Sequence, residues 1–182
     1  AKNVGQIWRA SNPEVGQMWE WLKVMTMSII QGDMTVAEGY RVTIWKDDNF
    51  LMILLPSGRR IHYYQPKVVE GRYGPTVCYQ GRNERTGGWG TIYTHPGKWT
   101  ENIIQAIARD VLRDNVLLST ATWMPWAPLV GHVHDEGVWM CRAEDAEKTL
   151  ETAGAMMSAG LPWAPGLDLD AEGAITLRYY KT

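Results

Sequence analysis

The sequence is poor in cysteine and in net charge, and each shortage narrows the choice of protein class. Two cysteines among 182 residues, Cys78 and Cys141, are too few for a disulfide framework and predict reduced thiols in a cytoplasmic setting. The net charge of −2 is less basic than a free-standing nucleic-acid binder usually is, so any contact with DNA must be local. No apolar run is long enough to span a bilayer and no signal peptide is recognisable, so no membrane partner is expected.

The pattern of apolar residues predicts an α+β fold with one core or two small lobes. Helices are expected at about 12–30, 99–116 and 143–158, and strands at 40–45, 50–55, 59–64, 76–80, 89–94 and 174–180. A side chain at Ser11-Asn12 is expected to cap the first helix, which should stop at Gln31-Gly32. We expect a small antiparallel sheet that includes a hairpin at 129–142 and packs on the three helices.

The most informative stretch is this hairpin, Gly131 to Met140, in which two carboxylates and a histidine lie between two short apolar runs. The sequence predicts a tip at Asp135-Glu136, with Gly137 providing the backbone freedom that the turn needs. A hairpin tip fixes a charged side chain in place while leaving it open to water or a metal. Asp, Glu and Gly are also ordinary turn formers, so a plain solvated turn is the competing interpretation.

A second stretch, Lys98 to Asp110, predicts a helix with one apolar and one polar face. Asn102, Gln105 and Arg109 share the polar face because they are spaced by three and four residues. Amide and guanidinium donors suit the DNA minor groove, where every base pair presents an acceptor in a similar place. Such a face is also often merely solvated. Arg59, beside Arg60 at a turn, has the same two interpretations: a phosphate contact or a solvated turn flank.

Together, the two stretches resemble consecutive blocks of the family A DNA polymerases, the bacterial polymerase I class and its phage relatives. His134-Asp135-Glu136 is similar to the third conserved palm motif of that family. The segments 55–60, 162–167 and 171–173 are similar to the phage-type enzymes. The resemblance implies that Asp135 is a metal ligand, that Glu136 is a less critical ligand or acts beside it, and that His134 lies near the primer terminus. It also implies that Gln105 and Arg109, with Asn102 and Lys98, hold the primer–template DNA.

The resemblance covers only the last part of a polymerase domain, with a post-fingers helix and β-hairpin region at 1–97 and a palm region at 98–182. We find neither the first palm motif, with its second metal-binding aspartate, nor the nucleotide-binding fingers helix. We therefore expect two Mg²⁺ ions shared with an aspartate of a separate N-terminal polymerase chain, with dNTP as substrate, in the cytoplasm of a bacterium or phage-infected cell. The start at Ala1 fits either processing or excision from a longer chain.

Two other functions are compatible with the sequence. His132, His134 and Asp135 nearly match a His-x-His-x-Asp zinc site, with the spacing short by one residue, and two histidines on one side of a strand would suit a hydrolytic metal. Alternatively, the chain is a non-catalytic assembly fragment that completes another protein. Metal analysis separates the first alternative from the polymerase, and exposed apolar surface on the isolated chain bears on the second.

Overall fold

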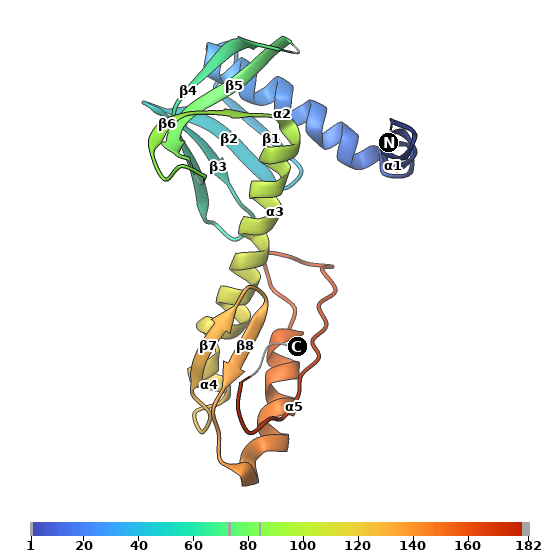
Figure 1. The fold of residues 1–182 in the computed structure, drawn as a ribbon, viewed down its shortest axis with the longest axis vertical. Coiled ribbons are helices and arrows are strands. Elements are labelled where there is room, and N and C mark those ends of the chain that lie inside the picture. Colours follow the sequence, from blue (N-terminus) through green and yellow to red (C-terminus); the bar gives the residue numbers. More distant parts are fainter. Residues whose placement is uncertain (1, 73, 84, 180–182) are drawn as a thin grey trace. The chain divides into compact units, whose positions relative to one another are not determined.

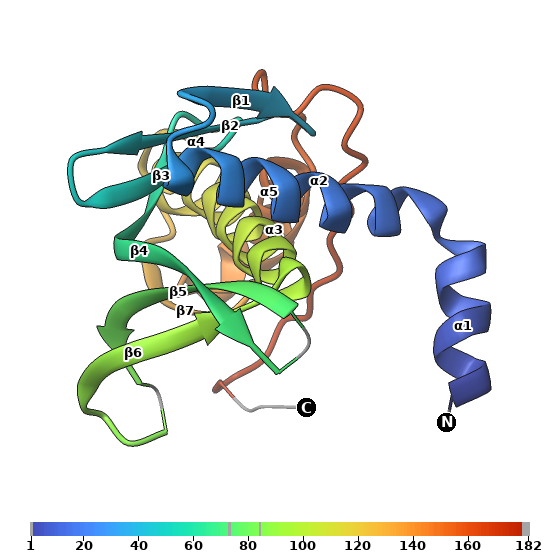
Figure 2. The same ribbon diagram turned by 90° about the horizontal axis from the view of Figure 1, so that it is seen from above.

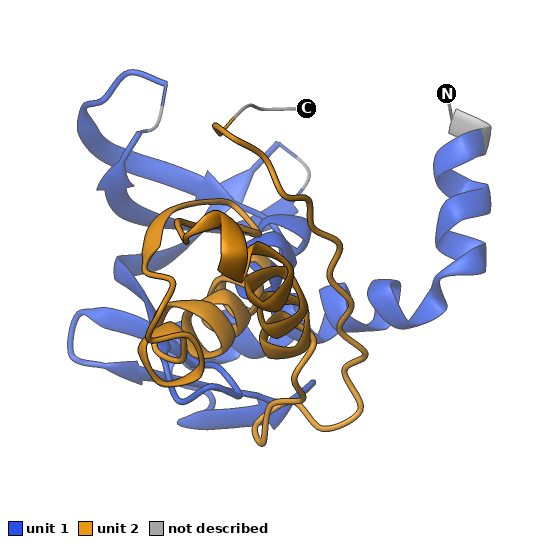
Figure 3. Ribbon diagram, turned by 90° about the horizontal axis from the view of Figure 1, so that it is seen from below, with its two compact units in different colours: residues 1–104 blue, residues 105–182 orange. Residues whose placement is uncertain are grey.

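The computed structural model describes residues 2–72, 74–83 and 85–179, and the chain divides into two compact units, 1–104 and 105–182 (Figure 3). The elements that begin in the first unit are α1 (Lys2–Ser11), α2 (Pro13–Gln31), β1 (Val36–Gly39), β2 (Val42–Asp47), β3 (Phe50–Leu54), β4 (Arg60–Gly71), β5 (Gly74–Arg82), β6 (Trp89–Thr94) and α3 (Pro96–Leu112) (Figure 1). The boundary between the units falls within α3. Each unit is described separately below.

The first unit is built on a six-stranded antiparallel sheet in which the strands follow one another in the order of the sequence, β1 to β6. Ile44 of β2 pairs with Ile53 of β3, which pairs in turn with Ile61 of β4. Ile44 and Ile53 are completely buried, because side chains alternate between faces along a strand and this face packs on the helices. Figure 2 shows α2 and α3 on this inner side of the sheet.

The predicted helix at 12–30 is confirmed as α2, but its start is not capped as expected. Asn12 makes no side-chain cap; its amide instead donates a hydrogen bond back to the carbonyl of Trp8, 2.8 Å away. The preceding residues form α1, which the sequence analysis did not predict. The predicted stop is confirmed: Gly32 follows α2 with φ of 90°, and its N–H donates to the carbonyls of Ser28 and Ile29.

The second unit contains the rest of the secondary structure. Its elements are a π-helical turn (Arg113–Leu117), α4 (Thr120–Trp123), β7 (Leu129–Val133), β8 (Glu136–Trp139), a 3₁₀ turn (Ala143–Asp145) and α5 (Ala146–Met157). Met124, Ala127, Ala153 and Met156 form a buried core, against which Trp126, Trp139 and Cys141 pack. Asn115 holds the end of α5 by donating to the carbonyls of Met157 and Ala159, at 3.1 and 2.8 Å.

The α+β class, the helix at 99–116 and the strands at 50–55, 59–64, 76–80 and 89–94 are confirmed, and the strand at 40–45 is confirmed from residue 42 onward, but two expectations are wrong. The hairpin at 129–142 is not part of the large sheet; β7 and β8 form a two-stranded sheet of their own in the second unit. The expected strand at 174–180 is absent over 174–179, which have no regular structure, and residue 180 lies outside the described residues. The confirmed helix at 99–116 is α-helical over 96–112 and continues as the π-helical turn over 113–117.

Candidate functional site

The turn between β7 and β8 brings His134, Asp135 and Glu136 together. Val133 pairs with Glu136, so the two residues that form the loop are His134 and Asp135. The predicted tip at Asp135-Glu136 is therefore wrong by one residue: Glu136 begins β8. The positive φ needed for a tight hairpin is supplied by His134, with φ of 52°, and not by Gly137. All three site side chains are exposed, and Asp135 stands at the apex of the turn.

Gly137 has a different function from the one predicted. A Cβ at this position would collide with the indole ring of Trp139, which lies across the glycine. The Trp139 indole N–H donates a hydrogen bond to the Thr120 hydroxyl at 3.2 Å, and its ring packs on the core of the second unit. Gly137 thus allows Trp139 to anchor the hairpin, and the anchored hairpin holds Asp135 in place.

Glu136 and Asp135 differ in their surroundings. The Glu136 carboxylate accepts a long hydrogen bond, 3.4 Å, from the hydroxyl of Tyr179 near the end of the chain. Desolvation, followed by the charge of Glu136, raises the pKa of the Tyr179 hydroxyl above its ordinary value. Glu136 therefore has a neighbour within this chain, whereas Asp135 lies at the open apex.

The candidate DNA-binding residues of α3 fall into two groups. Gln105 and Arg109 lie in the second unit with exposed side chains. Asn102 and Lys98 lie in the first unit, where Asn102 is half-buried and donates to the Tyr63 hydroxyl at 2.9 Å, and Lys98 pairs with Glu101 at 2.8 Å. The structure thus places Gln105 and Arg109 in the same unit as Asp135. Their predicted proximity to Asp135 stays a prediction.

Arg59 lies in the first unit, immediately before β4. Its backbone N–H donates to the Ser57 hydroxyl at 3.4 Å, and its carbonyl accepts from the Leu55 N–H at 2.8 Å, which closes the turn between β3 and β4. Its neighbour Arg60 lies over the ring of Trp45, with 5.5 Å between the guanidinium carbon and the ring centroid. The structure therefore gives the backbone of Arg59 a role in the turn, and its phosphate contact stays a prediction.

The described residues do not form a complete zinc site at the same turn. Among residues 2–72, 74–83 and 85–179, no three His, Cys, Asp or Glu side chains gather closely enough to hold a metal ion. The expectation that His132 and His134 share one side of a strand is wrong, because β7 ends at Val133 and His134 lies in the turn. For Mg²⁺, which takes one or two carboxylates and keeps several waters, exposed Asp135 fits as one ligand of a shared site.

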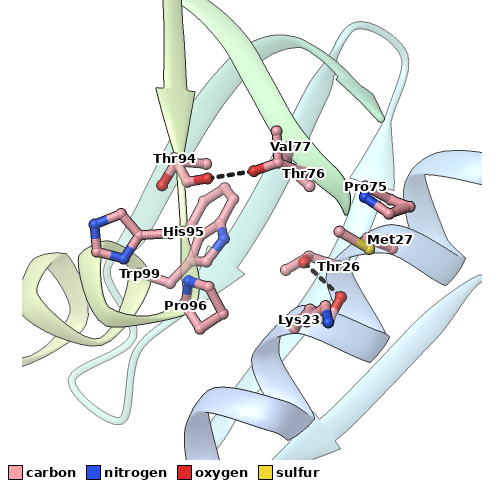
Figure 4. Close-up of a pocket in the computed structure, with 10 residues that line it drawn as sticks. All are labelled: Lys23, Thr26, Met27, Pro75, Thr76, Val77, Thr94, His95, Pro96 and Trp99. Carbon is pink, nitrogen blue, oxygen red and sulfur yellow. Dashed lines mark hydrogen bonds between the residues drawn. The ribbon is translucent and has the colours of Figure 1, made fainter. Parts of the chain in front are cut away.

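A small cavity in the first unit is lined by none of the candidate residues (Figure 4). Its volume is about 40 Å³, and its lining includes Thr26, Thr76, Thr94 and Trp99. The Thr76 hydroxyl donates to the carbonyl of Thr94 at 2.8 Å, and the Thr26 hydroxyl donates to the carbonyl of Leu22 at 2.6 Å. A space of this size accommodates water but not a nucleotide. The helices that the structure describes include none with the length and apolar character required to cross a membrane.

Comparison with known proteins supports the resemblance drawn from the hairpin and α3. The chain is similar to a protein named DNA polymerase from Bacillus phage SP02, with 33% identity over 177 residues. The match covers 96% of this chain but 26% of the phage protein, so the chain spans about a quarter of its relative's length. No protein-family model and no solved structure matches the chain. The predicted similarity to a phage DNA polymerase is therefore confirmed.

Proposed function

We propose that this chain is part of a template-directed DNA polymerase of family A, and that it supplies one catalytic carboxylate, Asp135. The observation that carries the proposal is the exposed His134-Asp135-Glu136 turn, within a chain that is similar over almost its whole length to part of a phage DNA polymerase. A structural reason supports the choice of Asp135: it is at the apex of an anchored two-stranded turn, whereas Glu136 is at the base of the turn beside Tyr179.

The reaction transfers a nucleotide to the 3′-hydroxyl of a primer and releases pyrophosphate. Bound Mg²⁺ would assist deprotonation of the hydroxyl and stabilise negative charge on the phosphate oxygens. Asp135 would hold this metal together with an aspartate from outside this sequence, because the described residues contain no three-ligand cluster. His134 would lie near the primer terminus, and Glu136 would act beside Asp135.

Primer–template DNA would be held by the exposed side chains of Gln105 and Arg109, with Asn102, Lys98 and Arg59 as further candidates. Donors from Gln105 and Arg109 match acceptors that every base pair presents in the minor groove, which suits an enzyme that must accept any sequence. Because Asn102 already donates to Tyr63, its remaining hydrogen-bonding capacity toward DNA is smaller.

We also propose that the fingers and the first palm aspartate come from a polypeptide segment outside this sequence. Two observations support this: the phage relative is almost four times as long as the matched region, and α1 exposes apolar side chains. Val4 and Ile7 are 70% and 59% exposed, and a contiguous apolar helix face commonly contacts a partner. An assembly fragment without catalysis would share this second observation, so activity must be measured.

Primer extension tests the proposal. The chain is purified through an affinity tag under mild conditions. Extension of a labelled primer with dNTPs and Mg²⁺ is then measured for the chain alone and for the chain with its co-purifying polypeptide. We expect extension only in the assembled sample. Robust extension by the isolated chain would contradict the shared site, and no extension by a stable assembly would favour the non-catalytic fragment. Tight stoichiometric zinc would instead favour the hydrolase.

A further inference from the structure

We propose that the outer face of the six-stranded sheet binds single-stranded DNA by stacking bases on its aromatic side chains. This face is opposite to the one that packs on α2 and α3, and it is separate from the Asp135 turn. We define it by six side chains on β2, β3, β4 and β6: Trp45, Phe50, Arg60, His62, Tyr64 and Trp89.

The strand register places these side chains on one face. Phe50 pairs with Tyr64, and residues two apart on a strand share a face, so His62 and Tyr64 lie on the same side as Phe50. Tyr64 pairs with Gln80, whose amide donates to the Thr91 hydroxyl on the next strand at 2.9 Å. The face therefore continues from β3 across β4 and β5 to β6.

The adjacent tyrosines of β4 show that the two faces have different roles. Tyr63 is 3% exposed and packs edge-on against Trp99 of α3, with ring centroids 4.3 Å apart. Tyr64 points to the other side of the sheet. Its ring neighbours there are Phe50 and Trp89, and both of these lie on strands. Packing against α3 thus explains Tyr63 but not Tyr64, which belongs to a second aromatic row on the outer face, where Met52 between Trp45 and His62 is 6% exposed.

The outer rings form a connected series. Ring centroids are 6.2 Å apart for His62 and Phe50, 5.2 Å for Phe50 and Tyr64, and 6.5 Å for Tyr64 and Trp89. Phe50, inside the series, is 39% exposed and Trp89, at one end, is 69% exposed, so both rings offer surface to the solvent. The bases of a single strand stack on successive exposed rings of this kind. Such stacking tolerates any sequence, because every base has a flat aromatic face.

Positive charge lies beside the rings. Arg60 is exposed and sits over the Trp45 ring, and Arg82 pairs directly across from Trp89. Asp47, opposite Phe50, is an acidic residue on the same face. Two guanidinium groups at the two sides of an aromatic row match a strand whose phosphates run along its stacked bases. The net charge of the chain is −2, so contact with DNA requires a local group of positive side chains, and this face provides one.

The geometry favours a single strand over a duplex, because bases in a duplex are already stacked on each other and cannot cover exposed rings. The choice of DNA over RNA rests on the proposed function, since a DNA polymerase works beside unpaired template. The stacking surface itself does not depend on Asp135, and the sequence analysis missed it. Its signal was available in the alternation of Phe50, His62 and Tyr64 with buried neighbours.

The test is a binding measurement that needs neither Mg²⁺ nor nucleotide, so its failure is distinct from failure of the polymerase proposal. Anisotropy of a labelled oligothymidylate of about 12 nucleotides, a length within the usual site size, is measured with the full chain at low salt. Trp89→Ala and Phe50→Ala should each raise Kd by roughly tenfold, and Trp89→Phe should raise it less than about threefold. Trp123→Ala is the matched control, since Trp123 is an exposed ring, 45% exposed, in the second unit.

Arg60→Gln gives a second readout that a folding defect does not imitate: the slope of log Kd against log salt should fall by about 0.7. Circular dichroism establishes that each variant is folded. The proposal is overturned if the folded chain does not bind the strand, if folded Trp89→Ala binds like the parent, or if Trp123→Ala weakens binding equally. A duplex that competes as well as the single strand, or an oligouridylate that binds tenfold more tightly, would also overturn it.

Discussion

The side-chain amide of Asn102 donates a hydrogen bond to the hydroxyl of Tyr63, with 2.9 Å between nitrogen and oxygen. This bond connects α3 to β4 of the large sheet. The Tyr63 ring also packs edge-on against Trp99 and Tyr79, at centroid distances of 4.3 and 4.9 Å. One buried phenol therefore holds the first part of α3, the helix that also carries Gln105 and Arg109.

Tyr63→Phe should lower the free energy of unfolding by about 1–2 kcal/mol at neutral pH, because the Asn102 amide loses its acceptor while the ring packing is kept. Burial, the largest cause, raises the pKa of Tyr63 above the ordinary value of 10.0. The unfolded tyrosine therefore ionises first as pH rises past 10.0, and stability is lost toward the folded pKa. Urea denaturation against pH should show this alkaline loss in the parent and a smaller one in the variant.

Tyr64→Phe is the matched control at neutral pH, since the Tyr64 hydroxyl has no part in the bond between Asn102 and Tyr63. It should leave the free energy of unfolding within about 0.5 kcal/mol of the parent. If the two variants were equally stable, the hydrogen bond between Asn102 and Tyr63 would contribute nothing measurable.

Asp114 should stabilise the second unit through its contacts with Arg113 and Trp163. Its carboxylate accepts from the Arg113 guanidinium at 2.6 and 2.9 Å and from the Trp163 indole N–H at 2.8 Å. The hydrogen bond from Arg113, the largest cause, lowers the pKa of Asp114 below the ordinary 3.8. Asp114→Asn should cost about 1–2 kcal/mol at neutral pH, and the difference should shrink as pH falls below 3.8 through the folded pKa.

Thermal unfolding of both proteins between neutral and acid pH measures this difference. Glu144→Gln is the control, because the Arg142–Glu144 pair is 82% and 71% exposed and an exposed pair contributes little. A loss on Asp114→Asn that persists undiminished in acid would mean that the charge of Asp114 is not its cause.

Gly137→Ala should displace the Trp139 ring and destabilise the hairpin by about 1–3 kcal/mol, as expected when an extra methyl group meets a packed side chain. The indole N–H signal of Trp139, assigned by NMR, should shift because its hydrogen bond to Thr120 is disturbed. Gly131→Ala on the paired strand is the control, since a Cβ there meets no atom within 4 Å. Equal effects of the two substitutions would contradict the anchoring role of Trp139.

His134→Gly should raise the free energy of unfolding by about 0.5–1 kcal/mol, because glycine adopts the positive φ of 52° at that position without steric cost. His132→Gly, in the neighbouring extended strand, should lower it. The same His134 variant should extend primers more slowly if the side chain lies near the primer terminus. Higher stability together with lower activity would separate the structural and functional roles of His134.

The sequence allowed most of the first unit to be predicted, because short apolar runs such as residues 50–55 lie between polar turns and Gly32 marks the end of α2. The turn at 134–135 was placed one residue late. Glycine is the usual residue at a positive φ, so this conformation was assigned to Gly137, whereas His134 adopts it. The role of Gly137 depends on the close approach of the Trp139 ring, which turn propensities do not predict.

Other features depend on contacts between distant residues and were not predictable in this way. The expected last strand over 174–179 has the right residues but is not paired with a partner strand, and Tyr179 instead reaches Glu136. Asn102 shares a helix face with Gln105 and Arg109 by spacing, yet its amide is directed to Tyr63, 39 residues away. Spacing therefore identifies candidates on a face, and packing decides which of them remain available.

Asp135→Asn in the assembled enzyme tests the central claim most directly. Primer extension with Mg²⁺ is measured on the chain with its co-purifying polypeptide, and assembly is verified by size-exclusion chromatography. Asp48→Asn is the matched control, because Asp48 is also an exposed acid at a hairpin turn, with φ of 46°. We predict that Asp135→Asn lowers the extension rate by at least about 100-fold with the assembly intact, and that Asp48→Asn does not. Extension at the parent rate by an intact Asp135→Asn assembly would contradict the account.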